Sequence, residues 1–176
     1  MNVAATPFLR SYWVVTGSLL AGCYPGDSVP AEADKKLDGL ASAGILHVVN
    51  LMEEGETNRQ GEPFVPYQPH FLARGIDCVR IPIQDFSTPT VDHMRVILDD
   101  IDAAIGGAAP TFVHCWGGRG RTGTVVGCYL VRHGLRHPEH ALGAITELQA
   151  GCAGTLSPSP ESEPQREFVR HWTPGT

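Results

Sequence analysis

A cysteine and an arginine with five residues between them, Cys115 and Arg121, are the residues in this chain best suited to chemistry. Three of the five residues between them are glycine, which lets the backbone turn its N–H groups towards one point. A guanidinium group can bind two phosphate oxygens at once, whereas an ammonium group cannot do so in the same geometry. A cysteine in such a loop is favoured as the thiolate, which can attack phosphorus. The spacing therefore predicts a nucleophile at Cys115 and a phosphate-binding side chain at Arg121.

The segments on either side predict how this loop is positioned. Residues 111–114 read as a short apolar strand, residues 117–123 as a glycine-rich loop, and the apolar pattern that follows as a helix ending at Gly134. The positive end of that helix adds to the attraction for an anion. In parallel α/β sheets, ligands bind beyond the carboxyl ends of the strands. The loop after residue 114 is therefore expected to form the site.

Strands alternate with helices along the rest of the chain, and residues 53–69 form a long polar loop. This alternation predicts one α/β domain over residues 1–176, with a mainly parallel central sheet flanked by helices. The predicted strands span residues 12–15 and 19–21, which pair as a hairpin, then 45–51 and 76–83; helices begin at Pro30, Pro89 and Pro138, and a last short helix carries Phe168, Val169 and Trp172.

The composition limits the partners. The chain has 176 residues, with 13 basic against 19 acidic side chains and a net charge of −6. No nucleic acid and no membrane are expected as partners, because a protein needs a basic surface to bind either of them strongly. The five cysteines include no Cys-x-x-Cys pair, and His133, His137 and His140 lack a carboxylate at ligand spacing, so neither a metal nor a cofactor is expected. A monomer is favoured.

Two locations are compatible with the N-terminal residues. The cysteine usage favours reduced thiols in a cytoplasmic protein. The alternative is a lipoprotein cleaved before Cys23, because Leu20-Ala21-Gly22-Cys23 after a modest apolar stretch imitates such a signal. Thr16, Gly17 and Ser18 dilute that stretch, which favours a strand instead.

Residues 114–123, HCWGGRGRTG, resemble the H-C-x-x-G-x-G-R-[S/T] signature of cysteine-dependent protein phosphatases of the dual-specificity branch. The aromatic residue and Gly-Gly after the cysteine are similar to those of the cyclin-dependent-kinase-associated phosphatases. Residues 81–85, IPIQD, end 30 residues before Cys115 and resemble the family's general-acid loop. The resemblance implies a dual-specificity phosphatase-like fold and a phosphocysteine intermediate. Cys115 attacks phosphorus, and Asp85 first protonates the leaving oxygen and then activates water.

The resemblance also implies roles for the neighbours of these residues. Thr122 is expected to donate its hydroxyl to the sulfur, and His114 to occupy a buried position from which it can tune the thiolate. Asp85 could instead cap the helix near Pro89, although Ser87 or Thr88 is the better cap. The substrate phosphate is expected to be bound by Trp116, Gly117, Gly118, Arg119, Gly120 and Arg121.

Three functions remain open at this point. The first is hydrolysis of phosphotyrosine in proteins, and also of phosphoserine or phosphothreonine, because the chain is too short for the dedicated phosphotyrosine loop of longer relatives. Arg119 supports the alternative, a phosphatase of a non-protein phosphate ester such as a phosphoinositide or nucleotide. The third, a pseudophosphatase, is opposed by the intact set of Cys115, Asp85 and Arg121. Cys78 is either a redox partner of Cys115 or, on the stronger interpretation, a core residue.

Overall fold

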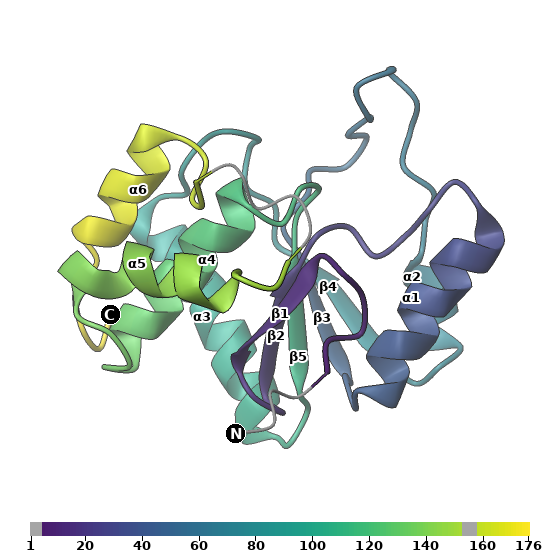
Figure 1. The fold of residues 1–176 in the computed structure, drawn as a ribbon, viewed down its shortest axis with the longest axis horizontal. Helices are drawn as coiled ribbons and strands as arrows, with labels where there is room; N and C mark the ends of the chain where they lie inside the picture. The colour runs from purple at the N-terminus through teal and green to yellow at the C-terminus, as the bar shows by residue number, and fades with distance from the viewer. Residues whose placement is uncertain (1–4, 153–157) are drawn as a thin grey trace.

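Five strands form one mixed sheet in the computed structural model of this protein, which describes residues 5–152 and 158–176 (Figure 1). β1 and β2 pair antiparallel, as the predicted hairpin requires, and every other neighbouring pair is parallel. The mainly parallel sheet is therefore confirmed. The strands lie in the order β1 (Ser11–Val15), β2 (Leu19–Gly22), β5 (Thr111–His114), β3 (His47–Asn50) and β4 (Asp77–Arg80).

Successive residues of the buried strands point to opposite faces of the sheet, so both faces present apolar side chains. Helices cover each face and bury these side chains. Leu20, Val48 and Phe112 pack under α1 (Pro30–Ser42) and α2 (Gln68–Leu72). The alternate residues of the same strands belong to a second, larger core with the other helices, which Figure 1 shows on the opposite side of the sheet. These helices are α3 (Val91–Gly106), α4 (Gly120–Arg132), α5 (Pro138–Leu148) and α6 (Glu163–Arg170).

α1 and α5 begin where the sequence signals them, whereas α3 begins later than predicted. Pro30 and Pro138 are the first residues of α1 and α5, where the missing N–H of proline costs nothing. The cap of α3 is Thr90, whose hydroxyl accepts from the His93 N–H at 3.1 Å. The prediction of Ser87 or Thr88 as that cap is therefore wrong, because the helix starts at Val91, two residues later than expected.

Two further boundaries differ from the prediction. The long loop at residues 53–69 ends early, because α2 begins at Gln68. The helix after the glycine-rich loop begins at Gly120, inside the segment expected to be loop. The glycine at 120 serves close packing, since a Cβ there would lie 3.1 Å from the side chain of Gln165.

The loops that follow the four parallel strands lie at one edge of the sheet. β2, β5, β3 and β4 all run in the same direction, so their carboxyl ends meet there. The loop from Cys115 follows β5, the 53–69 loop follows β3, and the segment with Asp85 follows β4. Residues distant in sequence are thereby brought to one place.

The N-terminal segment considered as a lipoprotein signal forms β1 and β2 of the sheet. Cys23 follows directly and is 7% exposed. Cleavage before Cys23 would remove both strands from the fold. Within residues 5–152 and 158–176, no helix is long and apolar enough to cross a membrane.

Candidate active site

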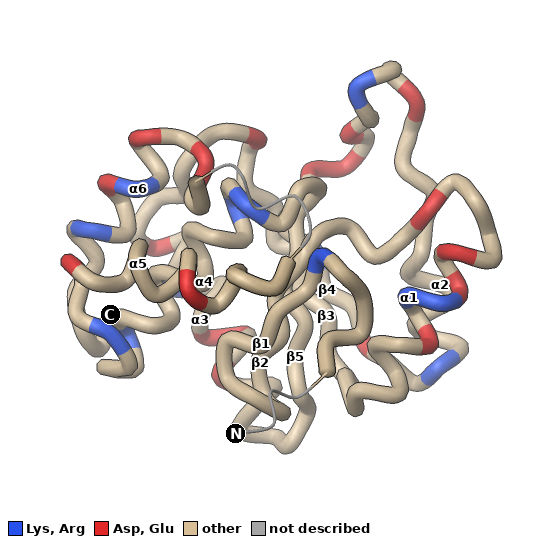
Figure 2. Tube along the Cα trace, viewed as in Figure 1, with Lys and Arg blue, Asp and Glu red and all other residues tan. Residues whose placement is uncertain are grey.

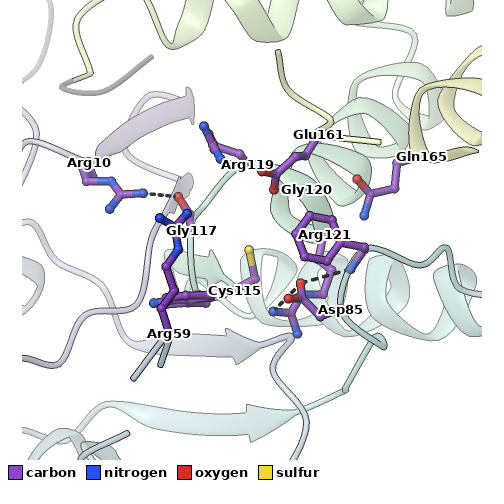
Figure 3. Close-up of a pocket in the computed structure, with 12 residues that line it drawn as sticks. Arg10, Arg59, Asp85, Cys115, Gly117, Arg119, Gly120, Arg121, Glu161 and Gln165 are labelled. Carbon is purple, nitrogen blue, oxygen red and sulfur yellow. Dashed lines mark hydrogen bonds and ion pairs between the residues drawn. The ribbon is translucent and has the colours of Figure 1, made fainter. Parts of the chain in front are cut away.

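A pocket of about 360 Å³ opens at this edge of the sheet (Figure 3). It brings together residues from five separate segments of the chain, so the parallel topology, rather than any local motif, assembles it. The residues that carry the argument below are Arg10, Arg59, Asp85, Cys115, Arg119 and Arg121, all of which line it.

Three carbonyl groups of the loop after β5 are engaged by donors that lie outside the loop. The Cys115 carbonyl accepts from His114 Nδ1, that of Trp116 from the Tyr24 N–H, and that of Gly117 from Arg10. Since the carbonyl and the next N–H of a planar peptide point in opposite directions, the N–H groups of the following residues face the pocket. The Gly118 N–H accordingly lies 3.3 Å from Cys115 Sγ. The loop is an anion nest built around the sulfur.

Gly118 is the one position in this loop where only glycine fits. Its φ is +72°, in the left-handed region that glycine occupies readily. A Cβ at this position would also lie 2.6 Å from the backbone nitrogen of Cys23. The end of β2 therefore supports the loop from outside.

Cys115 stands apart from the other four cysteines. Its side chain lines the pocket while being 3% exposed, and its sulfur accepts a backbone hydrogen bond. Burial raises the pKa of the four other thiols: Cys23, Cys78, Cys128 and Cys152. Those four thiols are therefore poor nucleophiles at neutral pH.

His114 is fully buried and uncharged. Burial lowers its pKa to about 3, so the ring is neutral at physiological pH. Because its Nδ1 donates to the Cys115 carbonyl at 3.1 Å, its Nε2 must accept from the hydroxyl of Tyr67. The ring thus fixes the backbone of Cys115, and the sequence did not indicate Tyr67.

Arg121 is held by carboxylates and carbonyls from two loops, those that follow β3 and β4. Its side chain is 2% exposed, and its two terminal nitrogens pair with both carboxylate oxygens of Glu56. It also donates to the carbonyls of Leu51, at 3.4 Å, and Ile83, at 3.2 Å. Burial opposes its charge, but the hydrogen bond with Glu56 and the nearby Cys115 outweigh it and raise its pKa. Sequence reasoning missed Glu56, whose only signal was its place in a long polar loop.

Asp85 is brought to Arg121 by a strained turn. Its Oδ1 lies 3.0 Å from Arg121 Nη2, and its side chain is 42% exposed. The next residue, Phe86, has a φ of +56°, which is costly for a residue with a Cβ. The segment around α6 holds this turn, because Ser162 donates to the Phe86 carbonyl and Gln165 to that of Ser87. Asp85 is therefore a pocket residue and not a helix cap.

Arg119 is balanced by a carboxylate inside the same pocket. Its Nη2 lies 2.6 Å from Glu161 Oε1, and both residues line the pocket (Figure 3). Trp116 packs edge-on against Phe64 and carries Arg59 above its ring at 5.9 Å. Thus the two residues that depart most from an ordinary loop of this kind, Trp116 and Arg119, both contact charged groups of the pocket.

Of three other residues considered in the sequence analysis, Cys78 and His133 do not line the pocket, and Thr122 has a hydroxyl group without a partner among the described residues. The hydroxyl of Thr122 is buried and has no hydrogen-bond partner within residues 5–152 and 158–176. Cys78 packs in the core on the α1 face, whereas Cys115 belongs to the core on the opposite face, which favours the core interpretation of Cys78. His133 pairs with Asp102 at 2.9 Å. No group of three metal-ligating side chains occurs in the described part of the chain.

A thiol in an anion nest, with an arginine and a carboxylate converging on it, is the arrangement of a cysteine-dependent phosphatase, and the fold is that of the dual-specificity phosphatases. Residues 10–172 match the family model described as PTP-SAK, Swiss Army Knife protein, DSP-PTPase phosphatase domain. The chain belongs to this family. The resemblance of residues 114–123 to dual-specificity phosphatases is confirmed.

The names of individual relatives indicate different activities. Human cyclin-dependent kinase inhibitor 3 is 27% identical over 76% of this chain and 62% of its own length. The phosphatidylglycerophosphate phosphatase PTPMT1 of Arabidopsis thaliana is 28% identical over 69% of this chain and 34% of its own length. A solved structure of kinase-associated phosphatase superposes with a TM-score of 0.71 at 20% identity, covering 94% of this chain and 93% of that one.

The sequence match covers only part of the length of these relatives. The chain spans 54% to 62% of the length of the first three curated relatives it matches.

Proposed function

We propose that this chain hydrolyses phosphate monoesters through a phosphocysteine intermediate. The observation that carries the proposal is the convergence of Cys115, Asp85 and Arg121 in one pocket, with the sulfur inside a backbone nest and Arg121 3.0 Å from Asp85. The arriving phosphate takes the place of Asp85 on Arg121 Nη2, which frees the carboxyl group for the leaving oxygen. Residues 1–176 act as one catalytic domain.

In the first step, Cys115 Sγ forms a bond to phosphorus while the ester P–O bond breaks. Asp85 gives its proton to the departing oxygen. The loop N–H groups from Trp116 to Arg121 and the Arg121 guanidinium bind the phosphate oxygens, which stabilises the charge that develops there. Glu56 keeps the guanidinium in the plane needed for two contacts.

In the second step, water attacks the phosphocysteine while Asp85 takes its proton. The S–P bond breaks, and the sulfur leaves as a thiolate with inorganic phosphate as product. The unpaired hydroxyl of Thr122 is available to donate to that sulfur. His114 is neutral and fixes the backbone of Cys115 instead of exchanging protons.

Two substrate classes are compatible with this reaction. Phe86 and Trp116 both line the pocket and could pack against the ring of a phosphotyrosine in a protein. Arg10, Arg59 and Arg119 line it as well and suit a compact ester with more negative charge. We propose the non-protein ester as the main substrate, because the guanidinium groups outnumber the carboxylates in the pocket. Protein phosphotyrosine is the second candidate. The relative named phosphatidylglycerophosphate phosphatase supports the first, and the mouse relative named dual specificity protein phosphatase CDC14B the second.

The role of Asp85 is tested by changing the leaving group. Asp85→Asn is expected to lower kcat/KM on an alkyl phosphate by on the order of 10²-fold or more, because an alkoxide cannot leave without a proton. The loss of kcat/KM on para-nitrophenyl phosphate is expected to be much smaller, since that phenolate leaves unprotonated, although kcat falls on both esters because the base of the second step is missing. The measurement is phosphate release from both esters at matched pH.

Asp92→Asn is the matched control, because Asp92 is an exposed aspartate on α3 that pairs only with Arg95 within the described residues. It should leave both rates as in the wild type. Equal losses on both esters in Asp85→Asn would contradict a general-acid role, and an unchanged rate on both would remove Asp85 from the mechanism.

A further inference from the structure

Two arginines beside the phosphate loop, Arg10 and Arg59, have no part in the proposed reaction. Arg10 precedes β1 and Arg59 lies in the 53–69 loop, and both line the pocket. In Figure 3 they lie on the same side of Cys115, opposite Asp85. We propose that these two guanidinium groups bind a second phosphate of the substrate while the loop holds the phosphate that is removed. The inference rests on the proposed function and extends it to the substrate class.

The four arginines of the pocket differ in how their charge is balanced. Arg121 pairs with Glu56 and Asp85, and Arg119 pairs with Glu161. Within residues 5–152 and 158–176, neither of the other two arginines has a carboxylate at ion-pair distance. The two carboxylates that line the pocket, Asp85 and Glu161, are thus already paired, and the charges of Arg10 and Arg59 are not balanced by an ion pair there.

This local excess contrasts with the charge of the whole chain, which is −6. Figure 2 shows acidic residues distributed over the helices and loops of the molecule. Uncompensated cations grouped at one pocket concentrate anions there and raise their rate of association. An uncharged peptide backbone gains little from such a group, whereas a second phosphate dianion gains two charge-assisted pairs.

Both arginines are positioned while most of their donors stay available. Arg10 Nη2 donates to the Gly117 carbonyl at 2.7 Å, one of the five N–H donors of its guanidinium. Arg59 lies over the ring of Trp116 at 5.9 Å, a cation–π contact that leaves its N–H groups free for hydrogen bonds. Trp116 in turn packs against Phe64. Trp116 therefore holds Arg59 beside the phosphate loop.

A compact polyol ester with two phosphates has the chemistry that these positions require. One phosphate enters the loop and the other reaches the two free guanidinium groups across the short distance of a small ring. Such a bisphosphate exists both as a soluble molecule and as a lipid headgroup, and the shared feature is the pair of phosphates. A phosphotyrosine peptide lacks the second group.

The test compares inositol bisphosphate with inositol monophosphate, using Arg10→Ala, Arg59→Ala and the double variant. The quantity measured is the ratio of kcat/KM for the two substrates, from release of inorganic phosphate. The wild type is expected to prefer the bisphosphate, and the ratio is expected to fall about tenfold in each single variant and further in the double one. Arg95→Ala is the control, since it removes the same charge from α3 outside the pocket.

A second readout does not depend on turnover. Binding of the bisphosphate to Cys115→Ser, measured by calorimetry, should weaken by a similar factor when both arginines are also replaced. The same dependence with phosphatidylinositol bisphosphate in vesicles would identify the lipid headgroup as the source, and its restriction to the soluble ester would identify the free form. Either result supports the second site.

A ratio that is the same in the wild type and the double variant would overturn the inference while leaving the proposed function intact. So would a phosphotyrosine peptide that is hydrolysed faster than both bisphosphates and is insensitive to the two arginines. Phosphate release from none of these esters would contradict the proposed function itself, and the inference with it.

Discussion

Cys115→Ser is expected to lower kcat by on the order of 10⁴-fold or more while phosphate binding is retained. The hydroxyl of serine is not ionised at neutral pH and has no base beside it, so the nucleophile is lost. The backbone nest and Arg121 remain, and these bind the anion. Phosphate release and calorimetric binding of inorganic phosphate, measured on the same preparation, separate the two effects.

Cys78→Ser is the matched control. Cys78 lies on β4 and packs in the core on the other face of the sheet, and burial raises the pKa of its thiol to about 11. This variant should keep the wild-type rate, and it also tests Cys78 as a redox partner. Substantial turnover in Cys115→Ser would contradict the mechanism.

Arg121→Lys is expected to lower kcat by about 10³-fold although the positive charge is kept. Lysine cannot contact two equatorial oxygens in one plane, and it cannot form the paired contact with Glu56. Because the lost interactions are strongest in the transition state, kcat and kcat/KM should fall together. Steady-state kinetics on para-nitrophenyl phosphate provide both values.

Arg132→Lys controls for the loss of a guanidinium from the same helix. Arg132 is 19% exposed and pairs with Asp99 and Asp102 outside the pocket. Thermal unfolding of both variants shows whether Arg121→Lys is folded at the assay temperature. A folded Arg121→Lys with less than a tenfold loss would show that bidentate phosphate binding is not needed.

The phosphate loop could be predicted from sequence because its determinants are local. The residues from His114 to Gly123 contain the nucleophile, the glycines and the arginine in one stretch between a strand and a helix. The order of the strands and of the longer helices was also predictable, since burial periodicity and the prolines at helix starts act over short distances, whereas the short helix α2 was missed. Asp85 was placed only through the resemblance, which supplied what spacing alone could not.

The partners of these residues could not be predicted because they come from distant segments. Glu56 reaches Arg121 only because the loops after β3 and β5 meet at one edge of the sheet. Tyr67 meets His114 for the same reason. A polar loop gives no periodic signal, so nothing in residues 53–69 distinguished the glutamate that enters the site from those that remain in solvent.

The prediction for Arg119 shows the limit of assigning a role from a motif. The sequence placed its guanidinium in the phosphate loop, and the structure does bring it to the pocket. The sequence, however, does not indicate that Glu161, 42 residues later, neutralises that charge. The free positive charge comes instead from Arg10 and Arg59, which lie far from the motif.

Trapping the covalent intermediate tests the central claim most directly. Asp85→Asn mixed with para-nitrophenyl phosphate should form the phosphocysteine, because this leaving group needs no proton, and should hydrolyse it slowly, because the base is missing. Mass spectrometry after an acid quench is expected to find one phosphate on the peptide that contains Cys115, and none in the variant that also carries Cys115→Ser. Release of nitrophenol without phosphate on Cys115, or with phosphate on another residue, would contradict the account.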